Sequence, residues 1–237
     1  MISLPTDPGF HRAFDIVAWG AALGLGWFVR KWRFADGTSA LPVHHGYYIS
    51  LGAGAITGAY LVGTAPSMMT GAFALSHSVA GALAGAIVAV ELYKLATGVK
   101  GSTGGVFVAP FALGIVIGRL GCLFAGLADG TYGTPTTLFW GVELGDGVSR
   151  HPVQLFESLA MSAFLGAYFV GLQTRAKWAL TNGFYVMAVF YGAQRFLWEF
   201  LKPYPKLIGP FNIFHIVSLG LVIYGCVFIA RNNERPA

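Results

Sequence analysis

Two arginines lie within strongly apolar segments that are long enough to form membrane helices. Arg119 follows the apolar run 107–118, and Arg195 lies within the run 190–200, with Glu199 one helical turn later. A charge near the hydrocarbon costs about 2.5–3.5 kcal/mol on insertion scales, so such residues usually face a polar cavity and a partner. We therefore expect an anion site within the membrane, and a phospholipid headgroup fits best. The alternatives are a snorkelling arginine at position 119 and a structural ion pair between positions 195 and 199.

Further polar residues are spaced to join these arginines. Tyr191 lies one turn before Arg195 on the same face of its helix. Gln154 and Glu157 lie three residues apart at the start of another apolar segment, and Arg150 precedes them in the same motif. These side chains are candidates for binding a substrate, although polar residues are also ordinary at the start of a helix.

A transfer reaction also needs a base to deprotonate its acceptor. His77, His151 and Asp129 are the candidates, because histidine titrates near neutrality and a carboxylate can also accept a proton. Cys122 could be a nucleophile or line the substrate site, although a membrane cysteine usually only packs. The spacing of Cys, His and acidic residues matches no zinc or iron pattern, so neither a metal nor another cofactor is expected.

The composition is that of a membrane protein. The chain has 237 residues, of which 55% are hydrophobic and 11% charged, and its mean hydropathy is +0.64. One membrane domain over residues 1–237 is the simplest organisation. The net charge of +5 is dispersed without a basic patch, which argues against nucleic acid as a partner. The first residues lack a basic stretch and a cleavage site, so no cleavable signal peptide is expected. Cys122 and Cys226 lie in apolar segments and predict no disulfide.

The sequence predicts an all-α fold with seven membrane spans and a small external loop region at 127–151. Residues 13–29, 47–64, 71–93, 105–126, 153–173, 178–201 and 211–230 are apolar over about the length that crosses the hydrocarbon. Basic residues concentrate after the odd-numbered spans, which predicts an external N-terminus and a cytoplasmic C-terminus. These residues are Arg30, Lys31, Arg33, Lys94, Lys100, Arg175, Lys177, Arg231 and Arg235.

Small residues recur four positions apart in four of these spans. Such pairs allow helices to approach closely in lipid. The pairs are Gly20 and Gly24, Gly54 and Gly58, Gly81 and Gly85, and Gly114 and Gly118.

Three motifs occur in the order that is typical of one family. They are Gly118-Arg119-Leu-Gly121, then Arg150-His151-Pro152-x-Gln154-Leu-Phe-Glu157, then Tyr191-Gly192-x-x-Arg195-Phe-x-x-Glu199-Phe200. Over about residues 70–220 the chain resembles the prolipoprotein diacylglyceryl transferases of the bacterial inner membrane. The resemblance implies seven spans and a periplasmic active face. It also implies transfer of diacylglycerol from phosphatidylglycerol to the lipobox cysteine of a prolipoprotein, with release of glycerol phosphate. In that family two arginines hold the donor phosphate, which here would be Arg119 and Arg195, and a histidine matching His77 has been discussed as the base.

The chain also departs from the family pattern. After its arginine the family has Gly-Asn-Phe-x-Asn-x-Glu-x-x-Gly, whereas this chain has Cys122, Ala125 and Leu127 at the positions of the two asparagines and the glutamate. Asp129, two residues further on, could replace the glutamate. His77 is followed by Ser78 and Val79 instead of two glycines.

Two other functions therefore stay open. One is a divergent family member that uses a phospholipid donor with a different acceptor. The other is a non-enzymatic lipid-binding or transport protein, against which the gathering of polar residues on one side argues.

Overall fold

The computed structural model describes residues 2–34, 44–71 and 73–234, so the predicted basic residue Arg235 lies outside the described part. Six segments of this part are long and apolar enough to cross a membrane. They are α1 (Gly9–Arg33), α2 (His45–Met69), α3 (Val79–Thr97), Gly105–Asp129 with α4 (Val108–Ala125) at its centre, α5 (Val153–Gln173) and α8 (Ile213–Asn233). They match six of the seven predicted spans and make this a multi-pass membrane protein.

The remaining predicted span, 178–201, is divided into three helical pieces. These are α6 (Lys177–Thr181), α7 (Gly183–Trp198) and the 3₁₀ turn η3 (Glu199–Leu201). With 16 residues, α7 is shorter than the roughly 20 residues that cross the hydrocarbon. The count of seven spans is therefore not confirmed.

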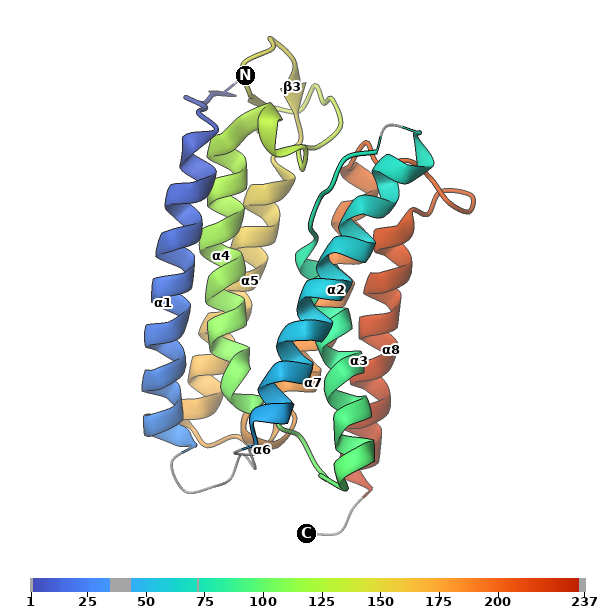
Figure 1. The fold of residues 1–237 in the computed structure, drawn as a ribbon. Helices are drawn as coiled ribbons and strands as arrows, with labels where there is room; N and C mark the ends of the chain where they lie inside the picture. Colours follow the sequence, from blue (N-terminus) through green and yellow to red (C-terminus); the bar gives the residue numbers. More distant parts are fainter. Residues whose placement is uncertain (1, 35–43, 72, 235–237) are drawn as a thin grey trace.

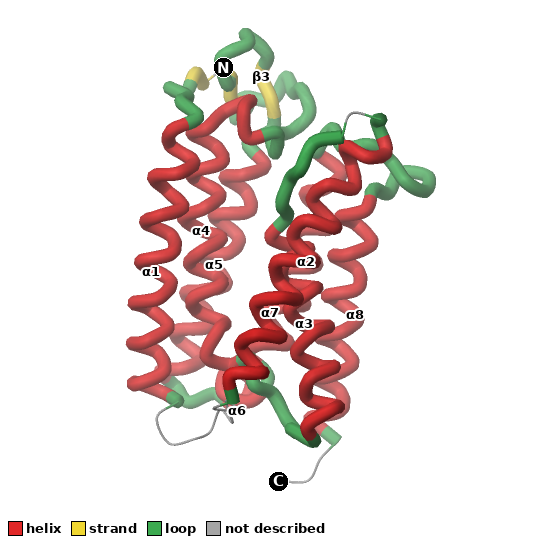
Figure 2. The backbone as a smooth tube through the Cα atoms, viewed as in Figure 1, coloured by secondary structure: helices red, strands yellow, loops and turns green. Residues whose placement is uncertain are grey.

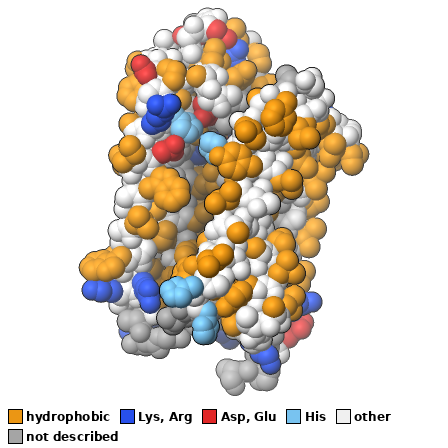
Figure 3. All heavy atoms as spheres, viewed as in Figure 1, with side chains coloured by type: hydrophobic (Ala, Val, Ile, Leu, Met, Phe, Trp, Pro, Cys, Tyr) orange, Lys and Arg blue, Asp and Glu red, His pale blue; other side chains and the backbone are white. Residues whose placement is uncertain are grey.

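The helices run alternately between two ends of the molecule (Figure 1). The N-terminus, loop 127–151 and the segment after η3 lie at one end, and the described C-terminal residues lie at the other. Figure 2 shows that the connections occupy these two ends. On the face shown in Figure 3, charged side chains also gather toward the two ends. This distribution suits a protein whose middle is surrounded by lipid.

The helices form two packed groups. In one group α1 packs on α4 and α4 on α5; in the other α2 packs on α3 and α7 on α8 (Figure 1). Contacts between α5 and α7 join the groups. The motif residues on α4, α5 and α7 therefore meet at the boundary between them.

The predicted close packing of small residues is confirmed for α2 and α3. A Cβ atom on Gly58 would collide with the backbone of Gly81 and Gly85, and one on Gly54 would collide with Gly85. In α1 and α4, by contrast, an added Cβ would have nothing within 4 Å at any of the paired glycines, which are Gly20, Gly24, Gly114 and Gly118. Four-residue spacing therefore marked a contact in two of the four helices with such pairs.

Helix α3 begins eight residues later than the predicted span 71–93. Ser78 caps its first turn by accepting a hydrogen bond from the Gly81 amide, and the segment before it is extended. Thr64 of α2 donates to the Ser76 carbonyl, and the Ser78 amide donates to the Ala59 carbonyl at 3.0 Å. These bonds satisfy backbone groups that a helix would otherwise satisfy internally.

Loop 127–151 contains regular structure that the all-α prediction did not include. The 3₁₀ turns η1 (Gly105–Phe107) and η2 (Gly126–Asp129) lie on either side of α4. Within the loop, strand β2 (Val142–Glu143) pairs in parallel with β1 (Ile2–Ser3) at the start of the chain. Strand β3 (Ser149–Arg150) pairs with β2 antiparallel. The small sheet joins the start of the chain to the loop above α4 and α5.

Candidate active site

Glu157 is the centre of a buried ion cluster between α4, α5 and α7. Its carboxylate lies 2.6 Å from Arg119 Nε, 2.6 Å from Arg195 Nη1 and 2.7 Å from Lys202 Nζ. Glu157 is completely buried, and the three cations are each at most 7% exposed. Sequence analysis placed Glu157 among the substrate-binding residues, whereas the structure gives it a role in holding three cations together.

Glu199 is the second carboxylate of the cluster. Its Oε2 lies 3.1 Å from Arg195 Nη2, which confirms the pairing expected from their four-residue spacing. Asn212 donates to Glu199 Oε1 at 3.3 Å and also caps the first turn of α8. The end of α7 and the start of α8 thus fix the Arg195 guanidinium from one side, while α5 holds it from the other.

The cluster carries more positive than negative charge. Among these ion pairs, three cations, Arg119, Arg195 and Lys202, face the carboxylates of Glu157 and Glu199, which leaves one surplus positive charge. The nearby Asp129 carboxylate is paired with His11 and is not part of this count. An uncompensated charge in a buried place is costly, so such a cluster favours an anion that completes it. Guanidinium groups suit phosphate especially well, because their planar donors match its oxygens.

Two uncharged polar groups near the cluster are also suited to binding a ligand. The Gln154 side-chain amide, one turn before Glu157, and the Tyr191 hydroxyl, one turn before Arg195, are both fully buried. Neither group has a hydrogen-bond partner among the described residues. Because buried polar groups are normally paired, these two are suited to hydrogen bonding with a ligand.

Lys202 is the cluster member that sequence analysis missed. It follows η3 and is 1% exposed. Burial and the neighbouring Arg195 cation lower the pKa of Lys202 to about 8, despite the Glu157 carboxylate beside it. Its position three residues after Glu199 was the only signal in the sequence.

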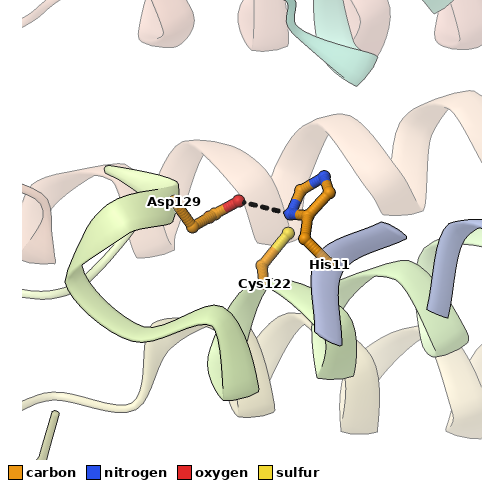
Figure 4. A group of neighbouring side chains, drawn as sticks. All are labelled: His11, Cys122 and Asp129. Atoms are coloured by element: carbon orange, nitrogen blue, oxygen red, sulfur yellow. Dashed lines mark ion pairs between the residues drawn. The ribbon is translucent and has the colours of Figure 1, made fainter. Parts of the chain in front are cut away.

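A second polar group lies beside the cluster on the side of α1. His11 Nδ1 is 2.8 Å from Asp129 Oδ1, and the Sγ atom of Cys122 is 3.9 Å from Arg119 Nη1. Figure 4 shows His11, Cys122 and Asp129 converging from α1, α4 and η2. Their donor atoms all lie within 4.8 Å of one another, close enough to hold a metal ion. Sequence analysis missed His11, since no local spacing links it to residues more than 100 positions away.

Arg150 and His151 lie in and next to strand β3 of the loop region and not among the ion pairs of the cluster. Arg150 pairs with Asp146 at 2.6 Å and lowers the pKa of that carboxyl group. The backbone amide of His151 donates to the Thr134 carbonyl at 3.0 Å, while its buried Nδ1 has no partner among the described residues. His151 therefore keeps an uncommitted nitrogen, whereas Arg150 is occupied by its carboxylate.

His77 is located on the α2 side of the molecule. It is exposed and belongs to the extended segment before α3, where its ring lies 6.5 Å from that of Tyr60. Gly63 of α2 leaves room for the His77 backbone, because a Cβ there would lie 2.6 Å from the His77 Cα atom. The contacts that the structure gives for His77 thus connect it with α2 and not with Glu157.

Fold and site together define a multi-pass helical membrane protein with a buried cluster of cations and carboxylates between its helices. The profile of the family described as prolipoprotein diacylglyceryl transferase matches residues 16–231. The chain belongs to this family, and the resemblance inferred from the three motifs is confirmed.

Curated relatives carry the same family name. Proteins named phosphatidylglycerol–prolipoprotein diacylglyceryl transferase from Finegoldia magna and Geobacter sulfurreducens are 32% identical over 132 residues and 33% identical over 137 residues. These alignments cover 55% and 54% of this chain and 50% of each relative. A relative of the same name from Oleidesulfovibrio alaskensis is 31% identical over 170 residues, covering 66% of this chain and 61% of that protein. The chain thus spans about half the length of the first two relatives. No solved structure gives a significant match.

Proposed function

We propose that this protein transfers diacylglycerol from phosphatidylglycerol to the lipobox cysteine of prolipoproteins and releases glycerol phosphate. The main support is the buried cluster with one surplus positive charge, in which Arg119 and Arg195 are held by Glu157. A phosphodiester bound there would complete the charge balance. Family membership and the names of the relatives support the same reaction.

In this proposal the donor phosphate contacts the two guanidinium groups and Lys202. As the bond between the glyceryl carbon and the phosphate oxygen breaks, negative charge grows on the leaving glycerol phosphate. Cations that are already in place stabilise this charge without rearranging, which lowers the barrier. Gln154 and Tyr191 supply hydrogen bonds from their unpaired groups. Burial keeps water away, which favours transfer over hydrolysis.

We further propose seven crossings, with the N-terminus outside and the active face toward the periplasm of a bacterial inner membrane. The alternating helix directions support this topology, with α6, α7 and η3 together forming the remaining crossing (Figure 1). Basic residues are concentrated at the opposite end from the ion cluster, which the positive-inside rule assigns to the cytoplasm.

The test is release of glycerol phosphate from phosphatidylglycerol liposomes that contain the purified protein, with and without a lipobox peptide. Peptide-dependent release and a diacylglyceryl-modified peptide are expected for the unchanged protein. Arg195→Ala should abolish both. Arg30→Ala is the control and should retain both, because Arg30 lies in the last turn of α1, at the end of the molecule away from the ion cluster. No release by the unchanged protein, or full release by Arg195→Ala, would contradict the proposal.

A divergent member with a different acceptor is the second candidate. It is favoured by Cys122 and Asp129, which form a polar group with His11 in the segment that departs from the family pattern. Release of glycerol phosphate while the lipobox peptide stays unmodified would favour this candidate.

A further inference from the structure

The group of His11, Cys122 and Asp129 offers nitrogen, sulfur and oxygen donors within 4.8 Å of one another. Ligands of a tetrahedral Zn²⁺ ion lie about 2.0–2.3 Å from the metal, so a compact set of this mixed type suits that ion. We propose that these three residues form a Zn²⁺ site whose fourth position takes the thiol of the acceptor. The assignment of the acceptor rests on the proposed function; the metal site itself does not.

Neighbouring groups support two of the ligands from behind. His11 faces Asp129 with Nδ1, and its other nitrogen, Nε2, lies 3.3 Å from a carboxylate oxygen of Asp15. The Thr131 hydroxyl donates to the second oxygen of Asp129. Metal-bound histidines commonly donate their remaining N–H to a carboxylate, which fixes the ring and strengthens the ligand. Asp15 and Thr131 are placed for this supporting role.

The site is accessible from one side. The side chain of Asp129 is 4% exposed and Cys122 is buried, whereas the side chain of His11 is 28% exposed, so the imidazole is the accessible part of the group. Three protein ligands with one open position are the arrangement of catalytic zinc sites. A water molecule or a thiol that enters from the His11 side would occupy the open position.

The position of Arg119 connects this site with the proposed donor site. Its Nη1 lies 3.9 Å from Cys122 Sγ, and its Nε lies 2.6 Å from Glu157. Arg119 therefore faces Cys122 on one side and the cationic cluster on the other. As ligands, the Cys122 thiolate and the Asp129 carboxylate would bring two negative charges to the metal ion, which offsets the repulsion from Arg119. A thiol on the zinc ion and a phosphate on the arginines would be close neighbours.

The reaction step balances as follows. The acceptor thiol binds Zn²⁺ as a thiolate and gives its proton to solvent, because a coordinated thiol is deprotonated. The sulfur forms a bond to the glyceryl carbon, and the bond between that carbon and the phosphate oxygen breaks. The phosphate oxygen keeps the electron pair, and glycerol phosphate leaves. The zinc ion is neither oxidised nor reduced.

The first experiment measures Zn²⁺ binding to the purified full chain by competition with a chromophoric chelator. One ion per chain is expected for the unchanged protein and for Cys226→Ser, which removes the exposed cysteine. Affinity should fall strongly in Cys122→Ser, Asp129→Asn and His11→Gln, and by about 10- to 100-fold in Asp15→Asn, which leaves the ligands intact. The metal site would be overturned if the unchanged protein did not bind one Zn²⁺ ion per chain. It would also be overturned if the three ligand variants bound Zn²⁺ as tightly as the unchanged protein.

The second experiment uses Co²⁺ in place of zinc, since its absorption spectrum reports thiolate ligands and tetrahedral geometry. Adding a lipobox peptide should change the spectrum, whereas the same peptide with serine in place of cysteine should not. Identical spectra with both peptides would overturn the acceptor assignment. Turnover of phosphatidylglycerol is followed in the same preparation. If the protein binds zinc but does not turn over phosphatidylglycerol, the proposed transferase function is refuted and the zinc site stands. If the protein binds no zinc and a chelator leaves turnover unchanged, the zinc site is refuted and the transferase function stands.

Discussion

Glu157→Gln is the substitution that tests the buried cluster most severely. The carboxylate lies 2.6–2.7 Å from three cationic nitrogens, and its side chain is completely buried. Glutamine has nearly the same shape but no charge, so the surplus charge of the cluster would rise from one to two. Removing one partner of a buried ion pair costs about 3–5 kcal/mol, because the other partner stays buried without compensation.

This loss corresponds to a decrease of roughly a hundred- to several-thousand-fold in the ratio of folded to unfolded protein. Reversible unfolding of the purified protein by sodium dodecyl sulfate in mixed micelles, followed by tryptophan fluorescence, measures it. Glu234→Gln is the matched control, since Glu234 is exposed at the end of α8, and a change within about 0.5 kcal/mol is expected there.

A double variant shows whether charge imbalance is the cause. Glu157→Gln combined with Lys202→Gln removes one negative and one positive charge, which restores a surplus of one. We expect part of the lost stability to return, so the two changes together should cost less than their sum. If Glu157→Gln were as stable as the unchanged protein, or the two changes were simply additive, the account of the cluster would be refuted.

Three further predictions concern donor affinity, stability at high pH and helix packing. Lys202, with its pKa lowered to about 8, loses its charge as pH rises through that value, so affinity for phosphatidylglycerol should fall there. In Lys202→Arg it should stay constant, and an equal fall in both proteins would contradict this role. The same shift should make the unchanged protein more stable as pH rises from about 8 toward the usual lysine pKa, because the unfolded chain then binds more protons. Gly58→Val should destabilise the protein by about 1–3 kcal/mol, because the added side chain collides with α3. Gly114→Val is the control and should have little effect, because space is open around Gly114. Equal unfolding midpoints of the two variants in detergent would contradict the packing of α2 on α3.

Much of the membrane architecture could be predicted from hydropathy. Span 153–173 coincides with α5, because an apolar run that begins after Pro152 and ends at Thr174 has clear limits. The start of α3 could not be predicted in this way. A hydropathy profile does not detect that Ser78 caps α3. It also does not detect that the Thr64 hydroxyl of α2 binds the segment before α3.

The candidate site could be predicted in part. Arg195 and Glu199 are one helical turn apart, so their pairing follows from local geometry. The meeting of polar side chains from different helices could not be predicted, because spacing along the chain does not say which helices are neighbours. The convergence of Arg119 and Lys202 on Glu157 depends on how α4, α5 and α7 pack. His11 and Asp129 likewise meet only because α1 packs against α4.

The central claim is that Arg119 and Arg195 bind the phosphate of phosphatidylglycerol, and the affinity for this lipid tests it most directly. Native mass spectrometry of the purified protein measures that affinity for the unchanged chain, Arg119→Lys, Arg195→Lys and the control Arg30→Lys. Lysine keeps the charge but loses the paired donors of the guanidinium group. We expect about 10- to 100-fold weaker binding in the first two variants, from the loss of about 1.5–3 kcal/mol of charged hydrogen bonding, and no change in Arg30→Lys. Equal affinity in all four proteins would contradict the claim.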